Sequence, residues 1–173
     1  MTPILTDRSF DIVTHSPAQT FRLGEELGRL LKPGDVVCLQ GGLGSWKTCL
    51  TQGIGSGLGV CGVIRSPSFV FVNEHPPSTM GPCLYHVDLY RIADGSAALA
   101  LGLDHYLYGD GVTVIEWAER ARDLAPAQRL WVSLSYLAFS KRSLVFDARG
   151  QHYAEIVAAL RSHLVVRESH EPR

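Results

Sequence analysis

The chain has 173 residues, enough for one domain with a hydrophobic core, and its 46% hydrophobic and 19% charged residues are typical of a soluble globular protein. Its net charge of −1 gives no overall basic field, which excludes a protein that binds nucleic acid by charge alone. No apolar run approaches the ~20 residues that span a bilayer and no signal-peptide core is present, so we predict a cytoplasmic protein without membrane association.

The predicted elements alternate between helix and strand early in the chain and cluster as strands late in it. In chain order they are helix 16–31, strand 36–40, helix 48–58, strand 69–73, strand 84–88, helix 95–103, strand 112–116, strand 130–137, strand 143–148 and helix 153–164. Ser16 is the expected N-cap of the first helix, with Pro17 as first helical residue and Gln19 closing a capping box.

The order of these elements predicts an α/β fold. Early alternation is typical of a parallel sheet covered by helices, and late clustering indicates an antiparallel extension. No repeat or linker divides the chain, so residues 1–173 are expected to form a single domain, with a frayed polar tail over 167–173.

The helix predicted over 48–58 contains Gly53, Gly55 and Gly57. Each glycine costs about 1 kcal/mol relative to alanine inside a helix. Either close packing against a neighbouring element compensates for this cost, or the helix is soft.

The four cysteines, Cys38, Cys49, Cys61 and Cys83, include no pair with C-x-x-C spacing. This arrangement disfavours both a zinc site and a disulfide framework. Reduced thiols in a cytosolic protein are the expected state.

A glycine-rich turn between the first predicted strand and the next helix carries most of a phosphate-binding motif. Residues 41–48 read Gly-Gly-Leu-Gly-Ser-Trp-Lys-Thr, where the motif is Gly-x-x-x-x-Gly-Lys-Ser/Thr. Backbone N–H groups of such a loop and the following helix N-terminus bind phosphate. Lys47 is expected to reach the β- and γ-phosphates of a nucleotide, and the Thr48 hydroxyl to ligate Mg²⁺.

Trp46 stands where the motif has its second glycine. A glycine there lets the backbone approach the phosphates without a Cβ in the way. The indole is therefore expected to obstruct the phosphates or to displace Lys47.

Phosphoryl transfer also needs an acid that holds the metal shell or positions water. Asp88 and Glu116 each end a predicted strand, where parallel strands open onto one crevice. The functional interpretation is favoured for Glu116. For Asp88, an ion pair with Arg91 is an equal alternative.

Other polar residues have structural interpretations as strong as functional ones. Ser66 and Ser68 are more simply turn formers than hydroxyls near a γ-phosphate. His86 is more simply a structural histidine, and Trp117 a core or edge aromatic.

Four stretches resemble the TsaE family, the small bacterial ATPases of tRNA threonylcarbamoyladenosine (t6A) synthesis. The similarity covers about residues 10–150. Besides 41–48, the stretches are Ser-Pro-Ser-Phe with Val-Asn-Glu (66–69 and 72–74), Tyr-His-Val-Asp-Leu-Tyr-Arg (85–91) and Ile-Glu-Trp-Ala-Glu-Arg (115–120).

The resemblance implies a three-layer P-loop NTPase-like fold that binds ATP and Mg²⁺. It implies action with TsaD- and TsaB-like proteins that modify adenosine 37 of tRNA, which this chain would contact only indirectly. By position, Asp88 matches an acid of the active-site crevice, and Thr48 and Glu116 match the Mg²⁺ site. The nucleotide-binding loop spans Gly41, Gly44, Ser45, Trp46, Lys47, Thr48 and Cys49.

Two residues depart from the family pattern: Gly42 replaces an aspartate and Trp46 replaces a glycine. We therefore expect weaker ATP binding than in family members, restored in Trp46→Gly. A nucleotide-binding scaffold that has lost hydrolysis is the first alternative, favoured by these departures. A small-molecule kinase is the second, although no substrate subdomain or arginine-rich lid is visible.

Overall fold

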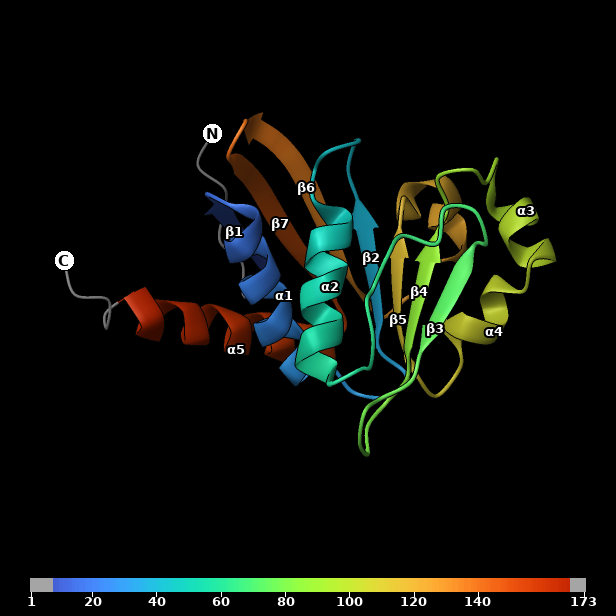
Figure 1. Ribbon diagram of the computed structural model, residues 1–173, viewed down its shortest axis with the longest axis horizontal. Coiled ribbons are helices and arrows are strands. Elements are labelled where there is room, and N and C mark those ends of the chain that lie inside the picture. Colours follow the sequence, from blue (N-terminus) through green and yellow to red (C-terminus); the bar gives the residue numbers. More distant parts are fainter. Residues whose placement is uncertain (1–7, 169–173) are drawn as a thin grey trace.

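The computed structural model describes residues 8–168, whose elements are shown in Figure 1. In chain order they are β1 (Ser9–Thr14), α1 (Pro17–Leu30), β2 (Val36–Gln40), α2 (Lys47–Leu58), β3 (Val72–His75), β4 (Leu84–Asp88), α3 (Gly95–Ala100), α4 (Leu103–Leu107), β5 (Val112–Glu116), the 3₁₀ helix η1 (Ala118–Leu124), β6 (Arg129–Ala138), β7 (Lys141–Arg149) and α5 (Gln151–Glu168).

The strands form one mixed sheet of seven in the order β1-β7-β6-β2-β5-β4-β3. Its centre is parallel: β2 pairs with both β5 and β6, and β4 pairs with β5. Both edges are antiparallel, through β3 on β4 and through β7 and β1 beyond β6. The predicted α/β class, with a parallel sheet and an antiparallel extension, is confirmed.

Alternating side chains of the central strands build a core on each face of the sheet. Val37 and Leu39 of β2 pack with α1, α2 and α5, whereas Val36 and Cys38 pack with α3, α4 and η1. Helices thus cover both faces, as Figure 1 shows, because parallel strands bury both of their faces. The expected three layers are present.

Close packing, not softness, accounts for the glycines of α2. A Cβ on Gly53 would lie 2.1 Å from the Phe21 carbonyl oxygen of α1, and one on Gly57 would lie 2.2 Å from that of Glu25. Gly24 and Gly28 face them from α1 with similar clearances. The two helix backbones therefore touch along a glycine seam that admits no larger residue.

Several boundaries differ from the predicted ones. Strand β1 was not among the predicted elements, because Phe10 and Ile12 are its only apolar residues packed against the core, and it lies at the sheet edge. Strand β3 begins at Val72 rather than at residue 69, because residues 67–71 form a turn in which two N–H groups donate to the Pro67 carbonyl.

The helical regions also differ in detail. The helix predicted over 95–103 is α3 and ends at Ala100; Gly102, at φ 83°, separates it from α4, and neither α4 nor η1 was predicted. Helix α5 continues through Glu168, since neither glycine nor proline interrupts it; of the frayed tail expected over 167–173, residues 169–173 lie outside the described part. The Ser16 cap is confirmed, with its hydroxyl accepting from the Gln19 N–H at 3.2 Å.

Candidate nucleotide site

The glycine-rich turn connects the buried strand β2 to helix α2, as the motif predicts. Gly41, at φ 157°, has no room for a side chain, because a Cβ would lie 2.5 Å from the Leu134 carbonyl oxygen. Gly44 has φ 71°, a left-handed conformation that favours glycine. Backbone conformation and close approach to β6 therefore fix the shape of the turn, and the N-terminus of α2 opens directly beyond it.

The Lys47 ammonium lies inside this turn. It donates to the Gly41 carbonyl at 2.6 Å, to the Gly42 carbonyl at 2.8 Å and to Ser45 Oγ at 3.2 Å, and it lies 4.1 Å from the centroid of the Trp117 ring. Burial lowers the pKa of Lys47, while the charge of Glu116 acts in the opposite direction. All three ammonium donors are used within the loop, so a phosphate would have to exchange with at least one of these partners.

Trp46 adopts the conformation that the motif reserves for glycine. Its backbone is left-handed, at φ 71° and ψ 30°, immediately before the first residue of α2. Its ring stacks on the guanidinium of Arg142 from β7, 3.8 Å from ring centroid to carbon. Lys47 lies inside the loop beside it, with its ammonium on the carbonyls of Gly41 and Gly42.

Glu116, at the end of β5, is the centre of a buried polar cluster and is only 2% exposed. Its Oε2 accepts from the Thr48 hydroxyl at 2.9 Å. Its Oε1 accepts from Thr51 at 3.3 Å and lies 2.7 Å from His86 Nε2. Because β2 and β5 are parallel neighbours, the helix after β2 brings Thr48 against the acid that ends β5.

Asp88 ends β4 and lies directly opposite Glu116 in the parallel register. One of its oxygens accepts from the hydroxyls of Ser66 at 2.5 Å and Ser68 at 2.9 Å; the other accepts from the Tyr90 N–H at 2.8 Å. These donors fix the carboxylate at the edge of the cavity. The alternative pairing of Asp88 with Arg91 is not the observed one, since the Arg91 guanidinium stacks on Phe69 at 4.6 Å.

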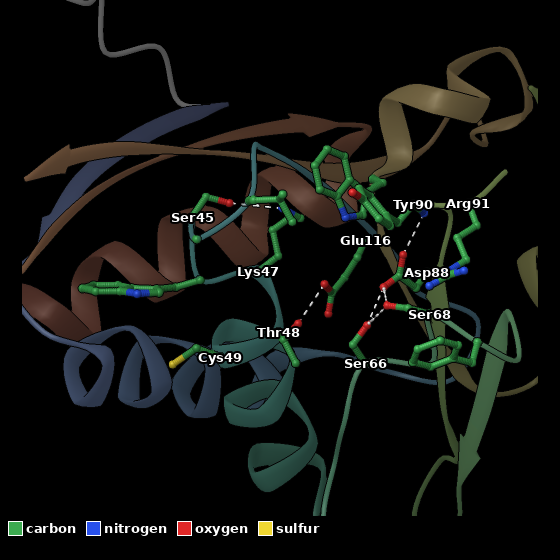
Figure 2. Close-up of a pocket in the computed structure, with 15 residues that line it drawn as sticks. Ser45, Lys47, Thr48, Cys49, Ser66, Ser68, Asp88, Tyr90, Arg91 and Glu116 are labelled. Carbon is green, nitrogen blue, oxygen red and sulfur yellow. Dashed lines mark hydrogen bonds between the residues drawn. The ribbon is translucent and has the colours of Figure 1, made fainter. Parts of the chain in front are cut away.

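The loop and both acids line one open cavity of about 470 Å³, shown in Figure 2. In that view Lys47, Thr48 and Glu116 face Ser66, Ser68 and Asp88 across it. Its lining residues are Leu43, Gly44, Ser45, Trp46, Lys47, Thr48, Cys49, Ser66, Ser68, Phe69, Asp88, Tyr90, Arg91, Glu116 and Trp117. All the predicted site residues therefore meet here except Gly41, which contributes its carbonyl to Lys47.

Comparison with known proteins identifies the family of the chain. A family model described as "Threonylcarbamoyl adenosine biosynthesis protein TsaE" matches residues 14–144. The chain belongs to the TsaE family. Two relatives named "tRNA threonylcarbamoyladenosine biosynthesis protein TsaE" are similar over most of their length. The one from Bacillus subtilis is 35% identical over 87% of this chain and 92% of its own, and the one from Treponema pallidum is 39% identical over 76% and 96%.

A solved structure shows the same fold. The crystal structure of Bacillus subtilis YdiB superposes with a TM-score of 0.76 at 31% identity, over 90% of this chain and 96% of that one. The TsaE family thus accounts for both the sequence and the architecture.

The TsaE chain offers few protein ligands for a metal. In the part of the chain that the structure describes, no three His, Cys, Asp or Glu side chains form a cluster that could hold an ion. Magnesium usually keeps several waters and takes one or two protein carboxylates together with substrate phosphates. The adjacent oxygens of Thr48 and Glu116, 2.9 Å apart, fit such a sparse site.

Three of the residues around this TsaE cavity were assigned structural roles from the sequence. Ser66 and Ser68 hold Asp88, and His86 holds Glu116. The spacing Ser-Pro-Ser was a visible signal, but a turn explained it equally well. Arg142 gave no signal at all, because it lies 98 residues from the loop carbonyl that it contacts.

In the described residues, no helix is both long and apolar enough to cross a membrane.

The four cysteines are free, with Cys38 buried and Cys61 exposed. The Cys49 thiol donates to the Pro17 carbonyl at 3.1 Å, and burial raises its pKa. Cys49 thus faces α1 as well as the cavity.

Proposed function

We propose that this TsaE-family protein is a single-domain ATPase over residues 1–173, which binds ATP with Mg²⁺ and hydrolyses it in support of t6A modification of tRNA. The observation that carries the proposal is the phosphate loop facing a buried acid, with Thr48 donating to Glu116 at 2.9 Å. The names of the Bacillus and Treponema relatives support the link to tRNA threonylcarbamoyladenosine.

The phosphate loop would bind the β- and γ-phosphates. The first residues of α2, from Lys47 to Cys49, present backbone N–H groups at a helix N-terminus, where negative charge is stabilised, and Gly44 and Ser45 line the same cavity. The Lys47 ammonium moves from the loop carbonyls to the γ-phosphate and stabilises charge there as the terminal P–O bond breaks.

Thr48 and Glu116 would hold the metal. Mg²⁺ supplies neutralisation of phosphate charge when it is bound. Glu116 keeps Oε2 directed at Thr48, because His86 and Thr51 occupy Oε1.

Asp88 is the residue that we assign to the attacking water. Ser66 and Ser68 hold one oxygen, so the carboxylate has a fixed direction at the edge of the cavity. From there Asp88 orients the water and accepts its proton as the new P–O bond forms.

We further propose that this cytoplasmic ATPase acts on TsaD- and TsaB-like proteins of the t6A complex and contacts tRNA only through them. A net charge of −1 supports an accessory role, because tRNA binding by the isolated chain would require a basic surface.

A scaffold without hydrolysis is the second candidate. Two observations favour it: the left-handed Trp46 in place of glycine, and the engagement of all three Lys47 donors inside the loop. Such a protein would bind partners without turning over ATP.

Calorimetric titration of ATP, with Mg²⁺ and with EDTA, tests the proposal. We expect micromolar binding that depends on Mg²⁺ and is weakened about tenfold in Thr48→Val but not in Thr48→Ser, which keeps the hydroxyl. ATP turnover is then measured with and without the partner proteins. Binding without turnover under both conditions would favour the scaffold, and absence of binding would refute the ATPase.

A further inference from the structure

Arg142 is a buried arginine that the proposed chemistry does not use. It lies on β7 on the same side of the strand as the core residues Leu144 and Phe146, and it is 5% exposed. The register places Arg142 opposite Tyr136 of β6. Arg142 is therefore the first of the inward-facing side chains of β7, next to the phosphate loop.

Two aromatic rings and four carbonyl groups contact the Arg142 guanidinium. The ring of Trp46 lies 3.8 Å away and that of Tyr136 lies 4.4 Å away. Nε donates to the Gly44 carbonyl of the loop at 2.7 Å. Nη1 donates to carbonyls of the β6–β7 turn, those of Ala138 at 2.7 Å, Lys141 at 2.9 Å and Phe139 at 3.4 Å.

We propose that Arg142 is a positioning residue that holds the Trp46 ring out of the phosphate site. The planar guanidinium stacks on the face of the indole and donates a hydrogen bond to the Gly44 carbonyl of the loop. These two contacts hold the indole and the loop on the β7 side. Trp46 lines the cavity but Arg142 does not, so the stack draws the indole toward the β7 side of the loop. The stack thereby makes a tryptophan acceptable where the motif has glycine. This inference rests on the proposed ATP site.

The inference makes the importance of Arg142 conditional on Trp46. Without the guanidinium, the indole loses its partner, and rotation about its side-chain bonds brings it toward the phosphates. With glycine at position 46 there is no ring to hold, and Arg142 retains only its hydrogen bonds. If Arg142 had only a structural role, its replacement would weaken ATP binding equally with tryptophan and with glycine at position 46.

Four proteins test this: the unmodified chain, Trp46→Gly, Arg142→Ala and the double variant, each titrated with ATP and Mg²⁺. We expect Arg142→Ala to weaken binding about tenfold in the unmodified background and less than about threefold in the Trp46→Gly background, with kcat at saturating ATP unchanged. Arg142→Lys, which keeps the charge without the planar stack, is expected to behave like the alanine variant. Arg149→Ala is the control, since Arg149 is an exposed arginine of the same strand.

Three outcomes would overturn the inference while the ATP site stands. The first is that Arg142→Ala weakens ATP binding equally in both backgrounds, and the second is that it weakens binding in neither. The third is that Trp46→Gly binds ATP more than about tenfold more tightly than the unmodified chain, which would show that the indole obstructs the site despite Arg142.

A readout without ligand separates this inference from the ATPase proposal. The Trp46 indole N–H gives an NMR signal that is assigned by its absence in Trp46→Gly. We expect Arg142→Ala to move this signal and Arg149→Ala to leave it in place. If no variant binds ATP, the ATPase proposal fails, and an unmoved indole signal overturns the inference as well.

Discussion

We expect replacement of Gly53 by alanine to lower the stability of the protein, although helix propensity alone predicts that it would raise it. Propensity alone predicts a gain of about 1 kcal/mol, because glycine is a poor residue inside a helix. In the structure, the added Cβ would lie 2.1 Å from the Phe21 carbonyl oxygen and 2.9 Å from the Gly24 Cα. Both are backbone atoms of α1, so no side chain can rotate to make room.

The expected magnitude follows from these two opposing contributions. Overpacking a core by one methyl group costs about 1–3 kcal/mol, and contacts with backbone belong at or beyond the upper end of that range. After the propensity gain, the Gly53→Ala variant is expected to lose about 2 kcal/mol of unfolding free energy. For a chain of this size, Tm should fall by roughly 4–8 °C.

The measurement is urea unfolding followed by circular dichroism, with Gly95→Ala as the matched control. Gly95 begins α3, and the nearest atom to its added Cβ is a flexible side-chain carbon of Leu124 at 3.3 Å. The control should therefore stay within about 0.5 kcal/mol of the unmodified chain. Displacement of α2 would also move Lys47 and Thr48, so ATP binding should weaken. A Gly53→Ala protein as stable as the unmodified chain would refute the close-packed seam.

Three further changes probe the site and the core. Glu116→Gln should abolish the Mg²⁺ dependence of ATP binding and lower turnover about 100-fold, measured across a range of MgCl₂; unchanged metal dependence would remove Glu116 from the metal site. Ser66→Ala should lower kcat about tenfold with little change in ATP affinity, because Asp88 loses one of its orienting donors; an effect on affinity alone would contradict this role. Burial raises the pKa of the Cys38 thiol to about 12, so the folded chain keeps a proton that the unfolded chain loses above its ordinary value of 9.0. The contribution of the Cys38 thiol to the unfolding free energy is complete below pH 9.0 and is lost as the pH rises toward 12. From about pH 8 to about pH 10 the unmodified chain should therefore lose about 1.4 kcal/mol more stability than Cys38→Ala. Equal losses of stability in the two proteins would refute the assignment.

The positions of the loop and the acids could be predicted because they depend on local sequence. A short apolar strand, a glycine turn and Lys-Thr at the start of a helix are contiguous in the chain and predict a strand–loop–helix unit. Asp88 and Glu116 follow from a rule about parallel strands, whose carboxyl ends open onto one crevice. The register confirms that these two residues lie side by side.

The roles of several neighbours could not be predicted, because more than one interpretation fitted the local pattern. Ser66 and Ser68 flank a proline and form a turn, but the same turn directs both hydroxyls to Asp88. The direction of the Trp46 ring depends on Arg142, far along the chain.

By itself, the sequence determined the α/β class, the glycine turn between β2 and α2, the acids at the strand ends and the family. Each of these follows from hydrophobic periodicity or from a contiguous motif, which reflects interactions between residues close in the chain. The tertiary structure alone decided that α1 and α2 meet along glycines, that β1 completes the sheet and that Arg142 reaches the loop. Those contacts join residues far apart in the chain, so they depend on the spatial order of the strands in the sheet and on how closely two helix backbones approach.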